Sequence, residues 1–365
     1  MVKSVYIHIP FCKTICSYCD FCKIYYNEKY INKYIDSLEK EIKDNYKNEI
    51  IDTIYIGGGT PSSLSYCELK KLFKILKIFN LNNDYEFTFE CNYEDINEKL
   101  LVLLKNNKVN RLSIGLQTFN NKYESFLNRK INKKEMIKKV NLSKKYFENI
   151  NVDLMYAFKG QSIDELASDL NIFLKLDVTH ISIYSLIIEK NTMLYINNIS
   201  ELNDDIQSIM YYKIVNILKE KGYFHYEISN FSKKGYLSKH NLTYWNNSNY
   251  YGFGLGSSGF IDNVRYSNTK NILDYINNRN IVLEFQNISK DQMIDDEVML
   301  NLRKTDGINK KEFYNKYKKS FYDLFNIDFL FDNNLLIDDG YNIYIPEDKL
   351  FISNEIIVNI LNNKL

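Results

Sequence analysis

Three cysteines, Cys12, Cys16 and Cys19, lie close together near the start of the chain. They follow an apolar run at 5–9 that predicts a strand, and Pro10 ends this strand because proline lacks the N–H that a sheet requires. The spacings of four and three residues put the three thiols on one loop, where their sulfur atoms can converge on a single centre. The sequence therefore predicts a ligand cradle at this loop.

Two kinds of inorganic centre suit such a loop. Zinc is one, because Cys-x-x-Cys spacing often serves it and Cys22 could complete a four-thiolate tetrahedron. An iron–sulfur cluster is the other, since its ligands also come from runs of closely spaced cysteines. Unconnected buried thiols are the weakest interpretation, because four of the 6 cysteines fall between positions 12 and 22.

Glycines and polar side chains follow further short apolar runs. Gly57, Gly58 and Gly59 precede Thr60, and they would either allow a ligand to approach the backbone or simply form a tight turn. Other polar residues end, follow or lie within later predicted strands: Glu90, Gln117, Arg129 and Asp153. Taken singly, each of these is more commonly a surface or capping residue.

His240 and Trp245 form a second conspicuous group, in a chain with 4 His and 1 Trp. They precede a glycine-rich stretch at 252–256. One interpretation is a buried aromatic corner in which the imidazole is hydrogen-bonded. The other is an axial ligand of haem, for which imidazole is a usual choice.

The elements that would position these groups alternate along the chain. Apolar runs that predict strands lie at 5–9, 50–56, 85–91, 109–116, 152–157 and 180–186, and helical periodicity follows each of them. This alternation predicts a parallel α/β sheet with right-handed crossovers. A doubly wound sheet and a barrel both fit, and in either one ligands gather at the carboxyl ends of the strands.

Composition limits the classes of partner. Lys and Arg number 47 against 46 Asp and Glu, so the net charge of +1 gives no electrostatic footprint for nucleic acid or an anionic membrane. No apolar run approaches the roughly 18 residues of a membrane helix. The chain enters its first strand directly, without room for a signal peptide, and the free thiols suit a reducing compartment. We therefore expect a cytoplasmic protein.

The cysteine loop resembles that of the radical S-adenosylmethionine (SAM) superfamily, whose Cys-x3-Cys-x-aromatic-Cys signature is filled by Cys12, Cys16, Tyr18 and Cys19. The resemblance implies a partial (β/α)6 barrel in which the three cysteines hold a [4Fe–4S] cluster and SAM binds the open fourth iron. An electron from the reduced cluster would break a C–S bond of SAM. A donor such as flavodoxin or ferredoxin would supply that electron.

Segments at 6–12, 89–92, 115–119, 128–129 and 153–156 resemble the coproporphyrinogen-oxidase-like branch of this superfamily. The resemblance implies SAM-binding roles for Tyr6, Tyr18, Gly58, Gly59, Thr60, Glu90, Gln117, Arg129 and Asp153. In such a site Arg129 would suit the SAM carboxylate and Asp153 the ribose hydroxyls. The chain departs from the branch at Tyr93, where proline is common, and at 157–159, where Gly-x-Pro is common.

Two activities exist within this branch. The segment 240–245 resembles the His-Asn-x-x-Tyr-Trp hallmark of the HemW family of haem chaperones, which implies that His240 binds haem. Phe21 stands where the oxidases have a further cysteine, and only 11 residues precede Cys12. We therefore expect a chaperone that passes haem to a haem-requiring protein. The alternative is an oxygen-independent coproporphyrinogen III oxidase, so whether the chain is an enzyme stays open.

The resemblance also implies three regions: a barrel at 1–222, an extension at 223–288 and a small, mainly helical, winged-helix-like domain at 289–365. In the last of these, periodicity predicts helices at 297–303, 310–317, 321–325 and 354–361, and a strand at 341–345. A homodimer and peripheral membrane contact are compatible with this organisation. A zinc-binding structural protein would leave the strand-end residues unexplained.

Overall fold

The computed structural model describes residues 1–279 and 281–365. Its largest sheet is 12-stranded, and its centre consists of neighbouring parallel strands. These are β1 (Ser4–Ile9), β4 (Ile50–Gly58), β5 (Asn80–Asn92), β6 (Arg111–Gln117), β7 (Asn149–Tyr156) and β8 (His180–Ser185). They match the predicted strands, and the predicted parallel α/β architecture is confirmed.

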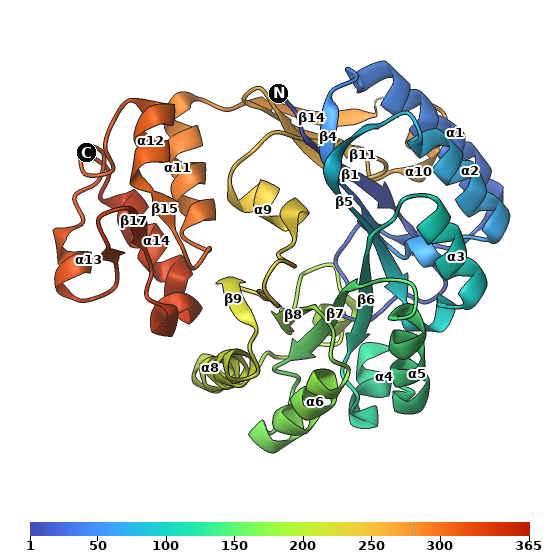
Figure 1. Ribbon diagram of the computed structural model, residues 1–365, viewed down its shortest axis with the longest axis horizontal. Coiled ribbons are helices and arrows are strands. Elements are labelled where there is room, and N and C mark those ends of the chain that lie inside the picture. The colour runs from blue at the N-terminus through green and yellow to red at the C-terminus, as the bar shows by residue number, and fades with distance from the viewer. Residues whose placement is uncertain (280) are drawn as a thin grey trace.

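Helices cover the convex face of this curved sheet (Figure 1). They are α1 (Glu28–Asn45), α2 (Tyr66–Leu76), α3 (Glu98–Asn106), α4 (Glu124–Leu127), α5 (Lys133–Ser143), α6 (Ile163–Lys175) and α8 (Asp204–Glu220). Capping boxes begin α2 at Ser65 and α6 at Ser162. In α1, Ile31, Ile35, Leu38 and Ile42 recur at helical spacing and are fully buried, so this helix is held on the sheet by an apolar stripe.

Residues beyond the barrel extend both ends of the same sheet. The strands β9 (Phe224–Glu227) and β10 (Asn230–Ser232) join beside β8, whereas β11 (Tyr250–Phe253), β12 (Ser258–Ile261), β13 (Val264–Asn268) and β14 (Val282–Asn287) continue from β1. The short helix α10 (Ile272–Ile276) packs on α1. The predicted boundaries at 222 and 288 stay a prediction, because the strands between them belong to the sheet of the barrel.

The chain must therefore cross from one end of the sheet to the other between β10 and β11. Helix α9 (Lys239–Trp245) lies on this crossing and stands on the concave side of the arc of strands (Figure 1). Its N-terminus is held by Glu86 of β5, whose carboxylate accepts from the backbone N–H groups of Lys239 and His240, each at 3.0 Å. The helix thus fills the interior of the partial barrel.

The C-terminal region is a separate group of helices with a small sheet. It contains α11 (Lys290–Asn301), α12 (Lys310–Tyr317), α13 (Asp328–Asp332) and α14 (Ser353–Asn362), with β15 (Ile308–Asn309), β17 (Asn342–Tyr344) and β16 (Ile337–Asp338) in that sheet order. The helix predicted at 321–325 is wrong. Those residues form a turn in which the rings of Phe321 and Phe325 pack against each other at a tilt of 41°, with centroids 4.9 Å apart.

Smaller elements complete the chain. Near the cysteines are β2 (Phe11–Cys12), β3 (Ile24–Tyr25) and α7 (Met193–Ile196), and the 3-10 turns are Pro61–Ser63, Tyr93–Asp95, Asn121–Tyr123 and Glu347–Ile352. Among the helices that the structure describes, none combines the length and apolar character needed to cross a membrane.

Candidate functional site

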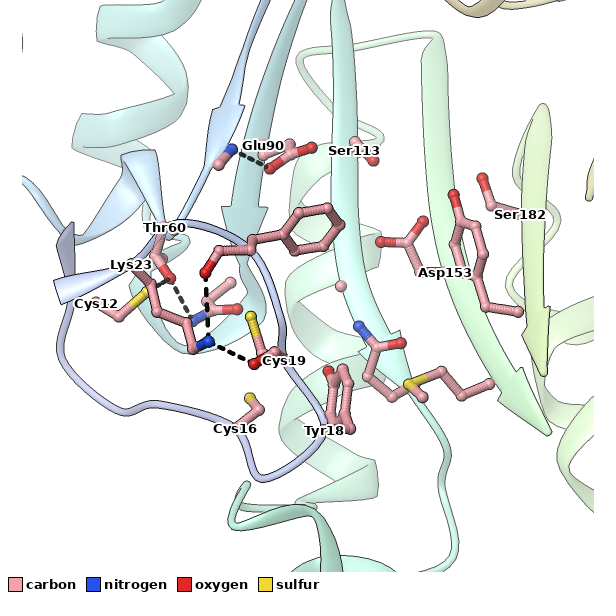
Figure 2. A pocket seen from close by; sticks show the side chains of 18 of the residues that line it. Cys12, Cys16, Tyr18, Cys19, Lys23, Thr60, Glu90, Ser113, Asp153 and Ser182 are labelled. Carbon is pink, nitrogen blue, oxygen red and sulfur yellow. Dashed lines mark hydrogen bonds between the residues drawn. The ribbon is translucent and has the colours of Figure 1, made fainter. Parts of the chain in front are cut away.

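A cavity of about 470 Å³ opens at the carboxyl ends of the parallel strands, beside the cysteine loop (Figure 2). Most of the residues proposed from the sequence line it: Cys12, Cys16, Tyr18, Cys19, Gly58, Gly59, Thr60, Glu90, Gln117, Arg129 and Asp153. The cysteines and Tyr18 come from the segment after β1, and Arg129 follows the short helix α4. The other residues lie in or just after β4, β5, β6 and β7. The structure thus brings eleven of the thirteen predicted residues to one place.

The cysteine loop is fixed by contacts with distant parts of the chain. Ser17 donates its backbone N–H to the carbonyl of Leu127 at 3.0 Å, and its own carbonyl accepts from the N–H of Leu194 at 3.2 Å. Asn128 donates its side-chain amide to the carbonyl of Ile15 at 2.9 Å. Figure 2 shows the sulfur atoms of Cys12, Cys16 and Cys19 facing the space that the loop encloses. The loop is therefore a preformed cradle for three thiolate bonds.

The thiols differ in environment. Burial raises the pKa of Cys12 to about 11, and Thr60 partly offsets this by donating its hydroxyl to Cys12 Sγ at 3.4 Å. Burial also raises the pKa of Cys19, whereas the nearby Lys23 ammonium lowers it. A buried thiol must lose its proton before it can bind iron, so cluster assembly at this loop releases protons.

Cys22 does not join the other three cysteines. A Cβ atom placed on Gly256 would lie 2.7 Å from Cys22 Sγ, so this thiol packs against the glycine-rich turn after β11. Among the described residues, no three Cys, His, Asp or Glu side chains are grouped as ligands of a single metal ion. This arrangement does not support the closed four-thiolate zinc site that the spacing left open.

The glycine turn at the end of β4 is built around Glu90. Gly58, at φ +114°, donates its N–H to Glu90 Oε2 at 3.1 Å, and Tyr55 donates its hydroxyl to Glu90 Oε1 at 2.7 Å. A Cβ on Gly59 would lie only 2.9 Å from Cys12 Sγ, so a larger residue there would displace the thiol. Burial, aided by Asp153, raises the pKa of Glu90 to about 7.

Asp153 and two arginines also line the cavity. Asn151 donates its amide to Asp153 Oδ1 at 2.8 Å, and burial raises the pKa of this carboxyl to about 6. Arg111 is 2% exposed and lowers the pKa of both Glu90 and Asp153. Its Nε and that of Arg129 are buried without a hydrogen-bond partner among the described residues.

Arg129 links the strand ends to the cysteine loop. Its Nη2 donates to Asn92 Oδ1 at 3.0 Å and to the carbonyl of Gly115 at 2.6 Å, while Nη1 lies 3.8 Å from Cys16 Sγ. Gln117 lines the cavity from a left-handed backbone conformation at φ +69°. Such strain in a residue with a side chain is typical of ligand sites.

Tyr6 and His240 are the two predicted residues that do not line this cavity. The hydroxyl of Tyr6 is hydrogen-bonded to His8 Nδ1 at 2.9 Å. His240 is 1% exposed, and its ring nitrogens are bonded to Thr53 Oγ1 and to the hydroxyl of Tyr244, each at 2.8 Å. Coordination of haem iron would require the ring to leave one of these partners. The haem-ligand prediction for His240 thus gains no support from this arrangement.

Several polar residues of the cavity wall are not among those predicted from the sequence. Tyr55, Arg111, Ser113, Asn151, Ser182 and Asn241 all line it. Alternation within the strands could have revealed some of them, because side chains two residues apart face the same side. Counting back from Gln117 through Gly115 leads directly to Ser113 and Arg111. No local signal would have placed Asn241 there, since α9 reaches the cavity only through the crossing between the sheet ends.

Residues 6–172 match the family model of the radical SAM superfamily. The chain is 38% identical to the haem chaperone HemW of Lactococcus lactis subsp. lactis (strain IL1403), over 97% of this chain and 96% of that protein. The chain belongs to the HemW family of the radical SAM superfamily. HemW of Bacillus subtilis (strain 168) is 35% identical, over 97% of this chain and 98% of that protein.

A solved structure shares the fold of this HemW family member. It is the coproporphyrinogen III oxidase HemN from Escherichia coli, with a TM-score of 0.84 at 19% identity, over 98% of this chain and 90% of that one. At this identity the likeness shows the fold. It confirms the predicted radical SAM architecture, including the helical region that follows the barrel.

The residues present fit a [4Fe–4S] cluster and SAM. Three thiols on one anchored loop are the donor set of such a cluster. The unpartnered Nε atoms of Arg111 and Arg129 suit an anionic group, and the carboxyls of Glu90 and Asp153 suit N–H and O–H donors. SAM carries both kinds of group.

Proposed function

We propose that this chain is a haem chaperone that binds a [4Fe–4S] cluster, SAM and haem, and delivers haem to a haem-dependent protein. The observation that carries the proposal is the match to haem chaperones along nearly the whole chain. The cavity supports it, because three cysteines face a pocket that can hold a polar ligand of the size and charge of SAM. When bound, the cluster and SAM would supply one-electron chemistry.

Different residues bind the cluster and the different parts of SAM. Cys12, Cys16 and Cys19 hold the cluster, and Arg129, whose Nη1 lies 3.8 Å from Cys16 Sγ, can orient a SAM carboxylate beside it. Thr60 and the glycine turn accept the amino end of SAM, while Asp153 faces its ribose hydroxyls. Tyr18 and Gln117 close the cavity around the ligand and exclude water. An electron donor of the flavodoxin or ferredoxin type would reduce the cluster.

Haem would bind at the rim of this cavity. Phe21, Tyr184 and Ile187 line the cavity and are 65%, 43% and 59% exposed. Apolar side chains left in water beside a polar pocket are typical of a ligand or partner surface. Helix α7, which presents Met193 at 51% exposure, is tied to the cysteine loop through Leu194 and Ser17. A planar apolar macrocycle can lie across this surface with its acidic groups in solvent.

A haem titration and transfer assay tests the proposal. The anaerobically reconstituted protein should bind haem with a Soret band and pass it to an apo-haem protein. The variants Phe21→Asp and Ile187→Asp should bind haem at least tenfold more weakly, whereas Tyr314→Asp, at an exposed site on α12, should bind like the parent. A parent protein that binds no haem, or that converts coproporphyrinogen III to protoporphyrinogen with SAM and a reductant, would overturn the chaperone assignment.

A further inference from the structure

The His-Asn-x-x-Tyr-Trp segment forms most of α9, and its histidine is enclosed in the protein. Both ring nitrogens of His240 have partners, and a neutral imidazole offers only one donor and one acceptor. Burial, together with the charge of Arg111, lowers the pKa of His240 to about 3. The ring is therefore neutral and satisfied, which is the condition of a structural imidazole.

The same ring contacts a residue of the cavity wall. The imidazole of His240 stacks on the ring of Tyr55, with centroids 5.1 Å apart and an angle of 29° between the planes. Tyr55 in turn donates its hydroxyl to Glu90 Oε1 at 2.7 Å. Two contacts thus connect the helix to a carboxyl that faces the cavity.

The helix also reaches the cavity directly. Asn241 lines the cavity that Glu90, Arg111 and Asp153 line. Glu86 holds the N-terminus of α9 on β5, two inward-facing positions before Glu90 on the same strand. The position of the helix and that of the carboxyl are therefore set by one strand.

We propose that α9 is a positioning element of the SAM cavity, in which His240 holds the ring of Tyr55 and, through its hydroxyl, the carboxylate of Glu90. The hallmark segment then acts on SAM, and haem binds elsewhere on the protein. Asn241 is the residue of the segment that touches the ligand. This inference rests on the proposed function, because it takes SAM as the occupant of the cavity.

The contacts from His240 through Tyr55 to Glu90 can be tested by asking whether the effects of substitutions on SAM affinity add up. Equilibrium dialysis of SAM with anaerobically reconstituted protein would compare the parent, Tyr55→Phe, His240→Leu, Glu90→Gln and the two double variants that contain Glu90→Gln. Tyr55→Phe keeps the ring and removes the donor to Glu90, so SAM affinity should fall about tenfold. His240→Leu should weaken SAM binding to a similar extent. Neither substitution should lower the affinity further once Glu90 is Gln.

A matched control separates positioning from general damage to the fold. His225 is also buried and stacked, with its ring 4.3 Å from that of Phe231 and Nδ1 2.9 Å from Glu347 Oε1, but it does not line the cavity. His225→Leu should destabilise the protein and leave SAM affinity unchanged. Tyr55→Phe keeps the test decisive even where His240→Leu fails to fold.

The outcomes distinguish this inference from the function on which it rests. Haem titration of Tyr55→Phe and His240→Leu should follow the parent curve. Loss of haem binding in His240→Leu with normal SAM affinity would overturn the inference and restore the haem-ligand assignment. Additive losses of SAM affinity with Glu90→Gln would overturn it as well. A parent protein that binds no SAM would overturn the SAM part of the proposed function, and the inference with it.

Discussion

The cysteine loop and helix α9 both carry residues of the kind that bind metals, but they differ in whether the ligand atoms are available. The sulfur atoms of Cys12, Cys16 and Cys19 face an open cavity (Figure 2), and the loop is held mainly through its backbone. In α9, the backbone and the imidazole of His240 are both engaged within the protein. A residue type suggests a ligand, but the partners of its polar atoms decide whether it is available.

The largest expected effect concerns the loop. Cys16→Ala should abolish iron and sulfide retention after reconstitution, because a cubane bound by two thiolates has lost a ligand that the cavity does not replace. The unfolding free energy of the cluster-free protein should change by less than about 0.5 kcal/mol, since Cys16 is partly exposed. Iron and sulfide analysis and urea unfolding measure the two effects. Cys22→Ala is the control, and loss of the cluster in that variant would contradict the distinction between these thiols.

In α9 we expect a substitution to lower the stability of the protein without loss of the cluster. Tyr244→Phe removes the hydroxyl bonded to His240 Nε2 at 2.8 Å and leaves a buried ring nitrogen without a partner. The free energy of unfolding should fall by about 1–3 kcal/mol, while iron content stays that of the parent. Urea unfolding gives the first quantity. A Tyr244→Phe variant as stable as Tyr314→Phe, whose ring is exposed on α12, would show that the imidazole is not held as described.

The pH dependence of stability sharpens the comparison at the cavity wall. Glu90 and Asp153 have pKa values raised by burial to about 7 and about 6. The folded state therefore keeps protons that the unfolded chain has lost, from pH 4.5 to about 7 at Glu90 and from pH 3.8 to about 6 at Asp153. Stability of the cluster-free protein should fall as pH rises through these windows, by up to about 1.4 kcal/mol per pH unit for each carboxyl. Urea midpoints that decline as steeply in Glu90→Gln as in the parent would contradict the raised pKa.

The smallest effect tests two strained residues at strand ends. Ala157 and Gln117 both adopt left-handed backbone conformations, at φ +63° and +69°. Glycine tolerates this conformation, so Ala157→Gly should raise the unfolding free energy by about 0.5–1 kcal/mol and leave SAM binding intact. Gln117→Gly should gain similar stability but bind SAM more weakly, because its side chain lines the cavity. Urea unfolding with SAM dialysis distinguishes the two variants.

Ala157 also illustrates what the sequence could predict. The sequence has alanine here, where the family pattern has glycine, and the positive φ of this residue after β7 explains why glycine suits the position. The parallel strands and the cysteine ligands were likewise predictable, because apolar runs and short spacings are local signals. Most of the eleven predicted site residues that line the cavity lie at or near a strand end, whereas Arg129 follows helix α4.

The position of α9 could not be predicted in this way. It depends on the crossing from β10 to β11, and no residue near His240 indicates that these strands join opposite ends of one sheet. A histidine beside a tryptophan in a glycine-rich neighbourhood is compatible with both exposure and burial. Tertiary contacts with Thr53 and Tyr55, far away in the sequence, settle which one occurs.

The backbone bonds that join Ser17 to Leu127 and Leu194 also set the order in which the protein can mature. The cysteines are the first functional residues to leave the ribosome, but the loop cannot take its final shape until residue 194 has been made, beyond the midpoint of a chain of 365 residues. Until then the loop lacks the distant contacts that fix its final shape, and its three thiols are open to oxidation or to the wrong metal. We therefore expect iron to enter late, after the barrel has formed.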